Sequence, residues 1–452
     1  MTTADRYYEK MTKTPIWRLI VSLGIPTTIS MLISSIYNLA DTYFVGSLGE
    51  SPQAATGILF TLQAIIQAIA FMLGQGSGSL VSKSLADKNT DEASRYVSTA
   101  FFTGAVAGTL LTTVGLIFLK PFMLLLGSTD TILPYACDYG MWVLISCPFM
   151  VCSLVMNNNL RFEGKAFYSM IGLSAGGILN IFGDWLLIRK FNMGVFGAGM
   201  STAISQMISF VLLLIFYHKT AQSKISFRSI SRRGRDYLDI VRVGFPSLIR
   251  QGLTSISHGI LNNLAKPFGD AAIAAMSVVN RFSSLVMCVG LGIGQGFQPV
   301  AAFNYRAKEH KRVRQGLLFT IVLGFCIVLV LSTVGFIFAE PIVRMFQESE
   351  EVIRVGAPAL RYATVGLLFL PLSIPVNMLY QSTRRAGIAS VLSLLRSGAL
   401  LIPALLITVR FWGLTGIQIS QPISDALTGL ISIPFIVHNL RKRKDREDVN
   451  KL

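Results

Sequence analysis

Two stretches of this chain of 452 residues follow the same pattern, and they decide its fold. They read GIPTTISMLISSIYNLAD, residues 24–41, and GFPSLIRQGLTSISHGIL, residues 244–261. Pro26 recurs as Pro246, but Asp41 has no acidic counterpart, because Leu261 stands at the matching place. Both stretches are apolar enough to predict membrane helices, so we expect a duplicated membrane protein in which only one half carries the acid.

The repeat continues along the whole chain in one order. Gly74-Gln75-Gly76 recurs as Gly294-Gln295-Gly296, Pro148 matches Pro371, and Gly194 with Gly197 matches Gly413 with Gly416. An internal repeat of this length indicates a fold built from two similar halves. An even number of helices in each half gives the two halves the same orientation in the membrane. We therefore expect four parts, namely an N-terminal six-helix lobe 1–217, a cytoplasmic basic linker 218–237, a C-terminal six-helix lobe 238–440 and a cytoplasmic tail 441–452.

The composition is that of an all-α integral membrane protein. Hydrophobic residues make up 52% of the chain and charged residues only 14%, whereas soluble domains carry about 25% charged residues. Apolar blocks long enough for a helix of roughly 20 residues predict twelve transmembrane helices in two pseudo-symmetric bundles. We place them at 16–45, 53–82, 96–119, 133–157, 166–188, 194–217, 238–262, 271–303, 315–339, 356–380, 387–409 and 412–437.

The net charge of +17 is distributed in the manner of a membrane protein. With the N-terminus placed in the cytoplasm, about 29 basic residues fall in inside loops and about 8 in outside loops. We expect a multi-pass protein of the cytoplasmic (inner) membrane with both termini inside, and no nucleic-acid partner. The five cysteines form no CxxC pair, and we read no removable signal peptide at the N-terminus.

Polar residues inside the predicted spans are the candidate functional groups, because such groups are costly in a membrane. Asp41, Asn180, Asp184 and Thr202 fall at similar depth in the first lobe. They offer only carboxylate, amide and hydroxyl ligands, which suit a proton or sodium ion rather than zinc or copper. The alternative is that Asp41 caps its helix and that Asp184 faces lipid headgroups. Tyr37 and Asn38 share the helix side of Asp41, and Gln206 lies one turn from Thr202.

Pro26 predicts a kink in the first membrane helix. On this hypothesis, protonation of Asp41 changes how the helix bends at Pro26. A fixed kink used only for packing is the alternative, since Pro246 occurs without an acid. The second lobe contributes its own polar candidates, with a structural or a cavity-lining role, and they are Gln251, His258, Arg396 and Asp425.

The chain resembles the multidrug and toxic compound extrusion family, MATE, over all twelve predicted helices. The resemblance rests on PTTISMLISSIYNLADTYFVGSLG (26–49), NNNLRFEGKAFYS (157–169), GGILNIFGDWLLI (176–188) and GAGMSTAISQ (197–206). It is closest to the bacterial DinF-like and MepA-like branch. It implies two six-helix bundles around a V-shaped cavity and cation-coupled drug export. It also implies that Asp41, Asn180, Asp184 and Thr202 form the cation site, supported by Tyr37, Tyr139 and Asn157.

These observations predict a secondary multidrug antiporter that exchanges organic, often cationic drugs for H⁺ or Na⁺ by alternating access. We expect a monomer that contacts drug-like molecules and the bilayer, with no cofactor besides the coupling ion. The sequence contains no Walker loop and no HExxH motif, and we do not expect an enzyme. A flippase for a lipid-linked substrate is the alternative within the same superfamily, and an intramembrane enzyme or a channel is the alternative of another class.

Overall fold

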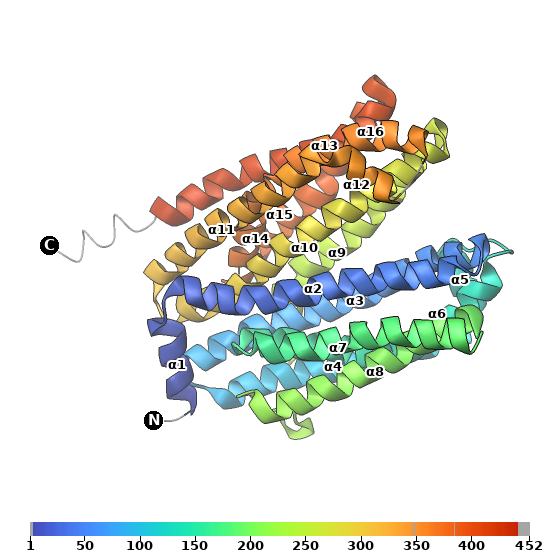
Figure 1. Cartoon of the computed structure of the whole chain (residues 1–452). Coiled ribbons are helices and arrows are strands. Elements are labelled where there is room, and N and C mark those ends of the chain that lie inside the picture. The colour runs from blue at the N-terminus through green and yellow to red at the C-terminus, as the bar shows by residue number, and fades with distance from the viewer. Residues whose placement is uncertain (1–2, 347–348, 384, 442–452) are drawn as a thin grey trace. The chain divides into compact units, whose positions relative to one another are not determined.

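The structure is a computed structural model that describes residues 3–346, 349–383 and 385–441, and their regular structure is helical throughout (Figure 1). The chain divides into two compact units. Unit 1 comprises residues 1–11 and 22–252, and unit 2 comprises residues 12–21 and 253–452.

The helices of the first half are α1 (Thr3–Lys13), α2 (Ile16–Gly46), α3 (Glu50–Ala86), α4 (Thr90–Ile117), α5 (Leu119–Leu125), α6 (Leu133–Phe162), α7 (Ala166–Asp184) and α8 (Gly194–Thr220). Those of the second half are α9 (Gly234–Ala265), α10 (Asp270–Arg306), α11 (His310–Ile337), α12 (Ala339–Phe346), α13 (Glu350–Leu367), α14 (Leu370–Ser382), α15 (Ala386–Leu394) and α16 (Leu401–Arg441). Short 3₁₀ turns span Phe227–Ser229 and Lys266–Phe268, and π-helical turns span Trp185–Lys190 and Leu395–Ala399.

The division into units does not fall at the linker. The first part of α9 groups with unit 1 as far as Gly252, and the predicted start of the second lobe at residue 238 stays a prediction. Backbones in close contact explain this grouping, because a Cβ added to Gly244 of α9 would lie 1.8 Å from the carbonyl oxygen of Met72 in α3. A Cβ added to Gly76 would likewise lie 2.1 Å from the carbonyl oxygen of Ile240. The first part of α9 is therefore a packed element of unit 1.

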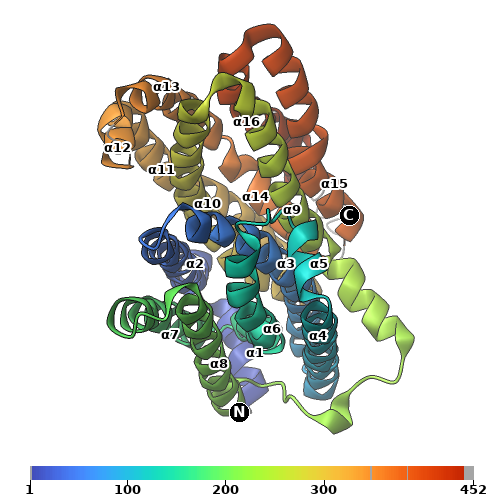
Figure 2. The same cartoon turned by 90° about the vertical axis from the view of Figure 1, so that its right-hand side faces the viewer.

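Unit 1 is organised around α6, which packs against α3, α4, α7 and α8. Figure 2 shows these helices of unit 1 nearly end-on, with α6 among them. Of the membrane-length window of α6, 72% is buried within the protein, the largest share among the candidate spans. Helix α6 therefore positions side chains toward several neighbouring helices at once.

Unit 2 repeats this plan with more breaks in its helices. A bend of 47° separates α13 from α14, whereas the matching α6 of unit 1 is a single helix through Pro148. Buried apolar side chains of α9, α10, α13 and α16, among them Leu261, Met276, Leu360 and Leu405, form its main core. Within α16 the backbone leaves helical geometry at Gly413, whose φ of 53° favours glycine.

The described residues include nine helical segments long and apolar enough to cross a membrane, or ten if α13 and α14 form one bent span. One of the nine, Ala386–Leu440, contains 55 residues and would extend about 80 Å at 1.5 Å per residue. It is broken at Gly413, so we assign two crossings to it. Helix α9 is not among these segments, and its crossing, predicted from the sequence at 238–262, stays a prediction.

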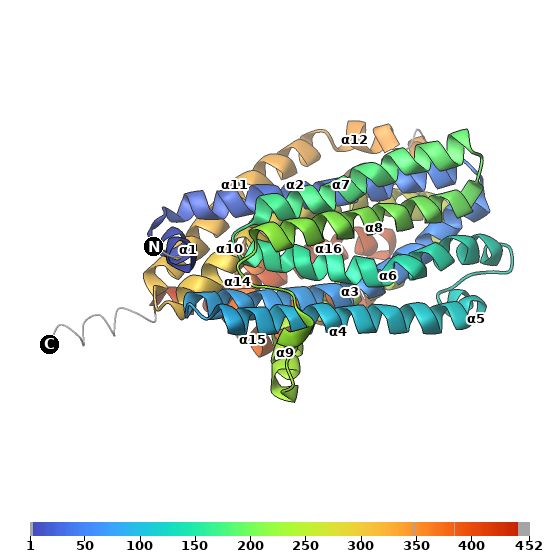
Figure 3. The ribbon, with the colours of Figure 1, turned by 90° about the horizontal axis from the view of Figure 1, so that it is seen from below.

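The segment between α8 and α9 follows α4 as an extended strap (Figure 3). Hydroxyl groups of α4 hold its backbone, since Ser94 Oγ accepts a hydrogen bond from the Lys224 amide at 2.8 Å and Thr99 Oγ1 accepts one from the Ser231 amide at 2.9 Å. Ser98 Oγ both accepts from the Ser226 amide and donates to the Lys224 carbonyl. The linker is thus docked on unit 1 over most of its length.

Candidate functional site

Side chains from four helices of unit 1 meet in one polar cluster. Tyr139 of α6 donates a hydrogen bond to Oδ2 of Asp41 in α2 at 2.8 Å, and its hydroxyl lies 3.2 Å from Oγ1 of Thr202 in α8. Asn180 of α7 donates through Nδ2 to Thr202 Oγ1 at 3.1 Å. Ser201 donates to the Asn180 backbone carbonyl at 3.0 Å. The cluster therefore forms a chain of hydrogen bonds from Asp41 to Asn180.

Asp184 lies one helical turn beyond Asn180 and is fully buried. Among the described residues, neither of its carboxylate oxygens has a hydrogen-bond partner, and the same holds for Asp41 Oδ1 and Asn180 Oδ1. Asp184 and Asp41 are also close enough for their charges to repel one another. Four buried acceptor oxygens without donors are unusual, because such groups normally find a partner.

These oxygens define the chemistry that the cluster can perform. A buried carboxylate without a partner is destabilised by loss of water, and a second carboxylate nearby adds repulsion. Binding of one small cation would relieve both penalties, and carboxylate, amide and hydroxyl oxygens are ligands for a proton or a hard cation. The described residues contain no group of three or more His, Cys, Asp and Glu side chains placed to hold a metal.

Small residues let the helices approach closely around the cluster. A Cβ added to Gly183 of α7 would lie 2.5 Å from the Ser201 hydroxyl oxygen of α8. A Cβ added to Gly177 would lie 3.0 Å from the ring of Tyr37, so α7 also packs against α2. Sequence reasoning did not single out Ser201, although its position beside Thr202 was the available signal.

The other predicted first-lobe residues lie at different distances from the cluster. Tyr37 is one turn before Asp41 on α2, and Asn38 accepts a hydrogen bond at its backbone carbonyl from Thr42 at 2.9 Å. Gln206 lies one turn from Thr202 and is half-buried. Asn157 is elsewhere, about 27 Å along α6 from Tyr139 at 1.5 Å per residue, where its Nδ2 donates to the Ser169 carbonyl at 3.1 Å. It joins α6 to α7 there and takes no direct part in the cluster.

Pro26 is buried within α2, which continues through it. Two hydroxyls donate hydrogen bonds to backbone carbonyl oxygens near it. Thr27 donates to the Leu23 carbonyl at 2.7 Å, and Ser30 donates to the Pro26 carbonyl at 3.0 Å. Its predicted role in a changing bend of α2 stays a prediction.

Unit 2 has its own buried polar group. Arg396 Nε donates to Asp425 Oδ1 at 2.9 Å, and Gln421 Nε2 donates to the same oxygen at 3.1 Å. This ion pair borders a cavity of about 70 Å³ lined also by Thr254 and Ser257. Thus the second-lobe acid, unlike Asp41 and Asp184, is neutralised by a basic side chain of the same unit.

The remaining second-lobe candidates are Gln251 and His258. Gln251 belongs to unit 1, where its Nε2 lies 3.5 Å from Gln67 Oε1. The side chain of His258 is outside the part that the structure describes.

A further buried acid, Glu163, was missed by sequence reasoning. It follows α6 directly and accepts hydrogen bonds from the Tyr217 hydroxyl at 3.1 Å, from the Gln222 amide and from the Ser223 hydroxyl. Burial raises the pKa of its carboxyl above the ordinary value, and these donors oppose the rise. Glu163 thus fixes the start of the strap, and its place between Arg161 and Gly164 in the quoted motif was the available signal.

Known proteins resemble this chain along its whole length. The Multidrug export protein MepA of Staphylococcus saprophyticus is 25% identical over 443 residues, covering 97% of this chain and 96% of that protein. MepA of Staphylococcus aureus strain NCTC 8325 is 26% identical over 441 residues, with the same coverage.

Solved structures share the fold. A crystal structure of MATE in complex with MaL6 superposes with a TM-score of 0.91 at 24% identity, covering 98% of this chain and all of that one. An outward-facing multidrug resistance MATE family transporter of the MOP superfamily also gives 0.91 at 24% identity, covering 96% and 98%. The MatE sequence profile matches residues 26–186 and 246–407, one segment in each half of the repeat, and the chain therefore belongs to the MatE family of membrane transporters.

Proposed function

We propose that this protein is a secondary antiporter that exports drug-like organic molecules, often cations, in exchange for protons or sodium ions. The observation that carries the proposal is the buried pair Asp41 and Asp184, with three of their four carboxylate oxygens lacking partners among the described residues. The names of the MepA relatives, multidrug export proteins, support the substrate class.

In the proposed cycle, Asp41 and Asp184 take up one coupling cation while the cluster is open to the outside. Tyr139 orients the Asp41 carboxylate through its hydrogen bond, and Asn180 and Thr202 supply neutral oxygens to the same ion. The bound cation weakens the attraction that the two acids exert on a cationic drug, so the drug leaves outward. The ion-loaded protein then exposes the cluster to the inside, where the ion is released.

Energy for this exchange comes from the ion gradient. A membrane potential of 100 mV supplies about 2.3 kcal/mol for each net charge moved, enough for a roughly fiftyfold gradient of a neutral drug per ion. A one-for-one exchange with a monovalent cationic drug moves no net charge, so the concentration gradient of the ion drives that exchange. We propose further that the protein acts as a monomer in the cytoplasmic membrane with both termini inside. The excess of basic residues in the loops on that side supports this orientation.

Efflux of ethidium from proteoliposomes under separately imposed pH and sodium gradients tests the proposal. Asp41→Asn and Asp184→Asn should each abolish gradient-driven efflux, because an amide cannot gain and lose the charge of the coupling ion. Asp138→Asn is the matched control, since Asp138 is the exposed neighbour of Tyr139 on α6. It should export at the wild-type rate.

Three results would contradict the proposal. Gradient-driven efflux that persists in both cluster variants would reject the coupling role of the acids. An uncoupled, non-saturating ion current would indicate a channel. Transfer of a lipid-linked sugar between leaflets without any ethidium efflux would favour the flippase.

A further inference from the structure

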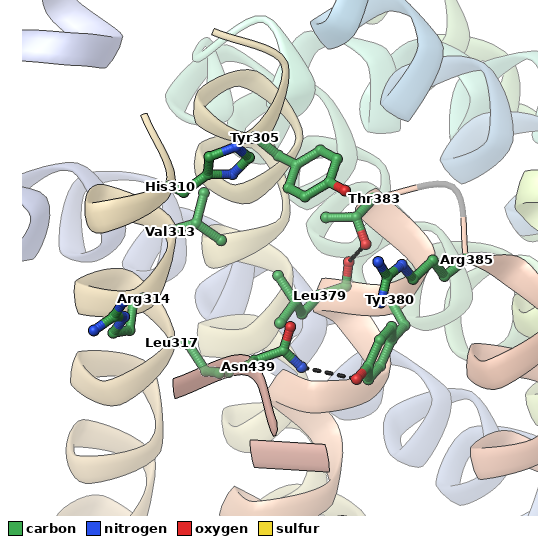
Figure 4. A pocket seen from close by; sticks show the side chains of 10 residues that line it. All are labelled: Tyr305, His310, Val313, Arg314, Leu317, Leu379, Tyr380, Thr383, Arg385 and Asn439. Carbon is green, nitrogen blue, oxygen red and sulfur yellow. Dashed lines mark hydrogen bonds between the residues drawn. The ribbon is translucent and has the colours of Figure 1, made fainter. Parts of the chain in front are cut away.

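A cavity of about 300 Å³ opens at the end of unit 2 where α11 begins and where α14 and α16 end (Figure 4). At about 30 Å³ per water molecule, it has room for roughly ten waters or a small headgroup. Arg314 and Arg385 lie on opposite sides of the opening in Figure 4, and His310 adds a third nitrogen-bearing side chain. Of the described residues that line the cavity, none is acidic.

Both arginines lack a carboxylate partner among the described residues. Neither side chain forms an ion pair or a hydrogen bond with the described residues, whereas the side chains of Arg396 and Arg344 in the same unit each contact an acid. Tyr380 and Asn439 bond to one another at 2.8 Å and form the polar floor of the cavity. Guanidinium groups around a polar floor suit the oxygens of a phosphate, which accept several N–H donors at once.

The internal repeat explains why this place is open in unit 2. Arg314 matches Ser94 of unit 1, and Asn439 matches Thr220 at the end of α8. In unit 1 the strap covers this place, because Ser94 holds the Lys224 amide and Glu163 holds the Ser223 hydroxyl. Ala386 of unit 2 matches Glu163, so the acid that fixes the strap has no equivalent there. The pocket is the second-lobe counterpart of a site that is filled by chain in the first lobe.

The position of Arg314 connects the pocket with the bilayer. Leu318, Val322, Phe325 and Leu329 continue from Arg314 at helical spacing on α11, and each is at least 41% exposed. An exposed apolar stripe on a membrane protein faces lipid chains. Arg314 therefore lies at the end of a lipid-facing stripe, and Leu317 and Leu379 give the pocket an apolar wall.

We propose that this pocket, which Arg314 and Arg385 line, binds the phosphate of an anionic lipid headgroup such as that of phosphatidylglycerol. Basic pockets between membrane helices on the cytoplasmic side are typical sites for such headgroups. Residues 442–452, which follow α16 as the strap follows α8, are the other candidate occupant. They contain five basic and three acidic residues, so their net charge is of the same sign as the pocket.

Native mass spectrometry of the purified full chain with equal amounts of phosphatidylglycerol and phosphatidylcholine tests this proposal. The wild type should retain phosphatidylglycerol preferentially. Arg314→Gln combined with Arg385→Gln should lower that preference roughly tenfold, the usual effect of losing a charge-assisted hydrogen bond. The double lysine variant, which keeps the charge, should retain most of the preference. Lys311→Gln and Arg410→Gln are matched controls, exposed and outside the pocket, and should behave as wild type.

These measurements distinguish a lipid headgroup from a soluble phosphate as the ligand. They record lipid retention and therefore do not depend on transport activity. An unchanged lipid preference in the double glutamine variant would overturn the proposal. Displacement of the lipid by millimolar glycerol 3-phosphate, with wild-type affinity for that soluble anion, would also overturn it in favour of a free phosphate. Removing residues 442–452 should leave lipid retention unchanged, and a severalfold rise would show that the tail occupies the pocket.

Discussion

The Tyr139 hydroxyl lies 2.8 Å from Asp41 Oδ2 and 3.2 Å from Thr202 Oγ1, so one tyrosine of α6 links an acid of α2 to a hydroxyl of α8. Tyr139 is 1% exposed. It holds Asp41 Oδ2 and leaves Oδ1 for another donor. We expect this asymmetry to influence the affinity of the proposed ion site.

Tyr139→Phe should therefore tighten ion binding. Loss of the hydroxyl leaves both Asp41 oxygens without a donor, and a hydrogen bond to a charged group contributes about 1.5–3 kcal/mol. We expect the ion concentration for half-maximal efflux to fall about tenfold or more, while the maximal rate falls because release slows. Transport kinetics in proteoliposomes measure both quantities, and an unchanged half-saturation would show that Tyr139 does not orient Asp41.

Gly244→Ala should destabilise the protein. Its new methyl group would lie 1.8 Å from the Met72 carbonyl oxygen, which is a backbone atom and cannot rotate away. Overpacking of this kind costs typically about 1–3 kcal/mol. Gly252→Ala is the control on the same helix, since nothing lies within 4 Å of its added Cβ. Thermal unfolding midpoints in detergent should fall for Gly244→Ala and should hold or rise for Gly252→Ala.

Glu163→Ala should release the strap. The Ser223 hydroxyl and the Gln222 amide would lose their acceptor. The strap would then detach transiently from unit 1 and expose its backbone near Lys224. We expect trypsin to cleave after Lys224 or Arg228 severalfold faster than in wild type. Glu92→Ala removes an acid at the start of α4 whose nearest basic atom is 3.6 Å away, and its cleavage rate should be unchanged.

The strap should also respond to pH. Because burial raises the pKa of Glu163, the folded state holds its proton at pH values where the unfolded state has lost it. The stabilising contribution is complete below the unfolded pKa and is lost as the pH rises through the folded pKa. Hydrogen-exchange protection of residues 222–226, corrected for the intrinsic rate, should fall across that interval. In Glu163→Gln the protection should not change with pH, and a persisting slope would assign the effect to another group.

Arg396→Ala should be more harmful than removal of the whole ion pair. It would leave Asp425, which is 3% exposed, as an unpaired buried charge, and breaking such a pair costs about 3–5 kcal/mol. The double variant Arg396→Leu with Asp425→Leu should recover most of that loss. Thermal unfolding of the two variants measures the difference, and equal stabilities would indicate that Asp425 finds another partner.

The large features of the fold were predictable because they repeat and because membrane helices are long. The spacing of Pro26 and Pro246 predicted two matching halves, and the family match to both halves confirms the MATE resemblance. The amphipathic α1 and the short α5 and α12 were not predicted, since these helices are too short or too polar to register as spans. The π-helical turns at Trp185–Lys190 and Leu395–Ala399 have no signal in apolar periodicity.

The candidate site was predictable only in part. Spacing places Asn180 and Asp184 on one helix face, but it does not tell which residues of other helices meet them. Tyr139 came from the family resemblance, and Ser201 was missed because its role depends on the close approach of Gly183. Asn157, by contrast, was named as a supporting residue of the site. It is a polar residue of α6, the helix that carries Tyr139, but it lies far along that helix from the cluster.

The unpartnered oxygens of Asp41, Asn180 and Asp184 have a consequence for measurement as well as for transport. A ligand present at a hundred times its dissociation constant stabilises the folded state by about 2.7 kcal/mol. The melting temperature of the purified protein should thus titrate with sodium or with acid, whichever the cluster accepts. Heating curves alone would then name the coupling ion before any drug is known.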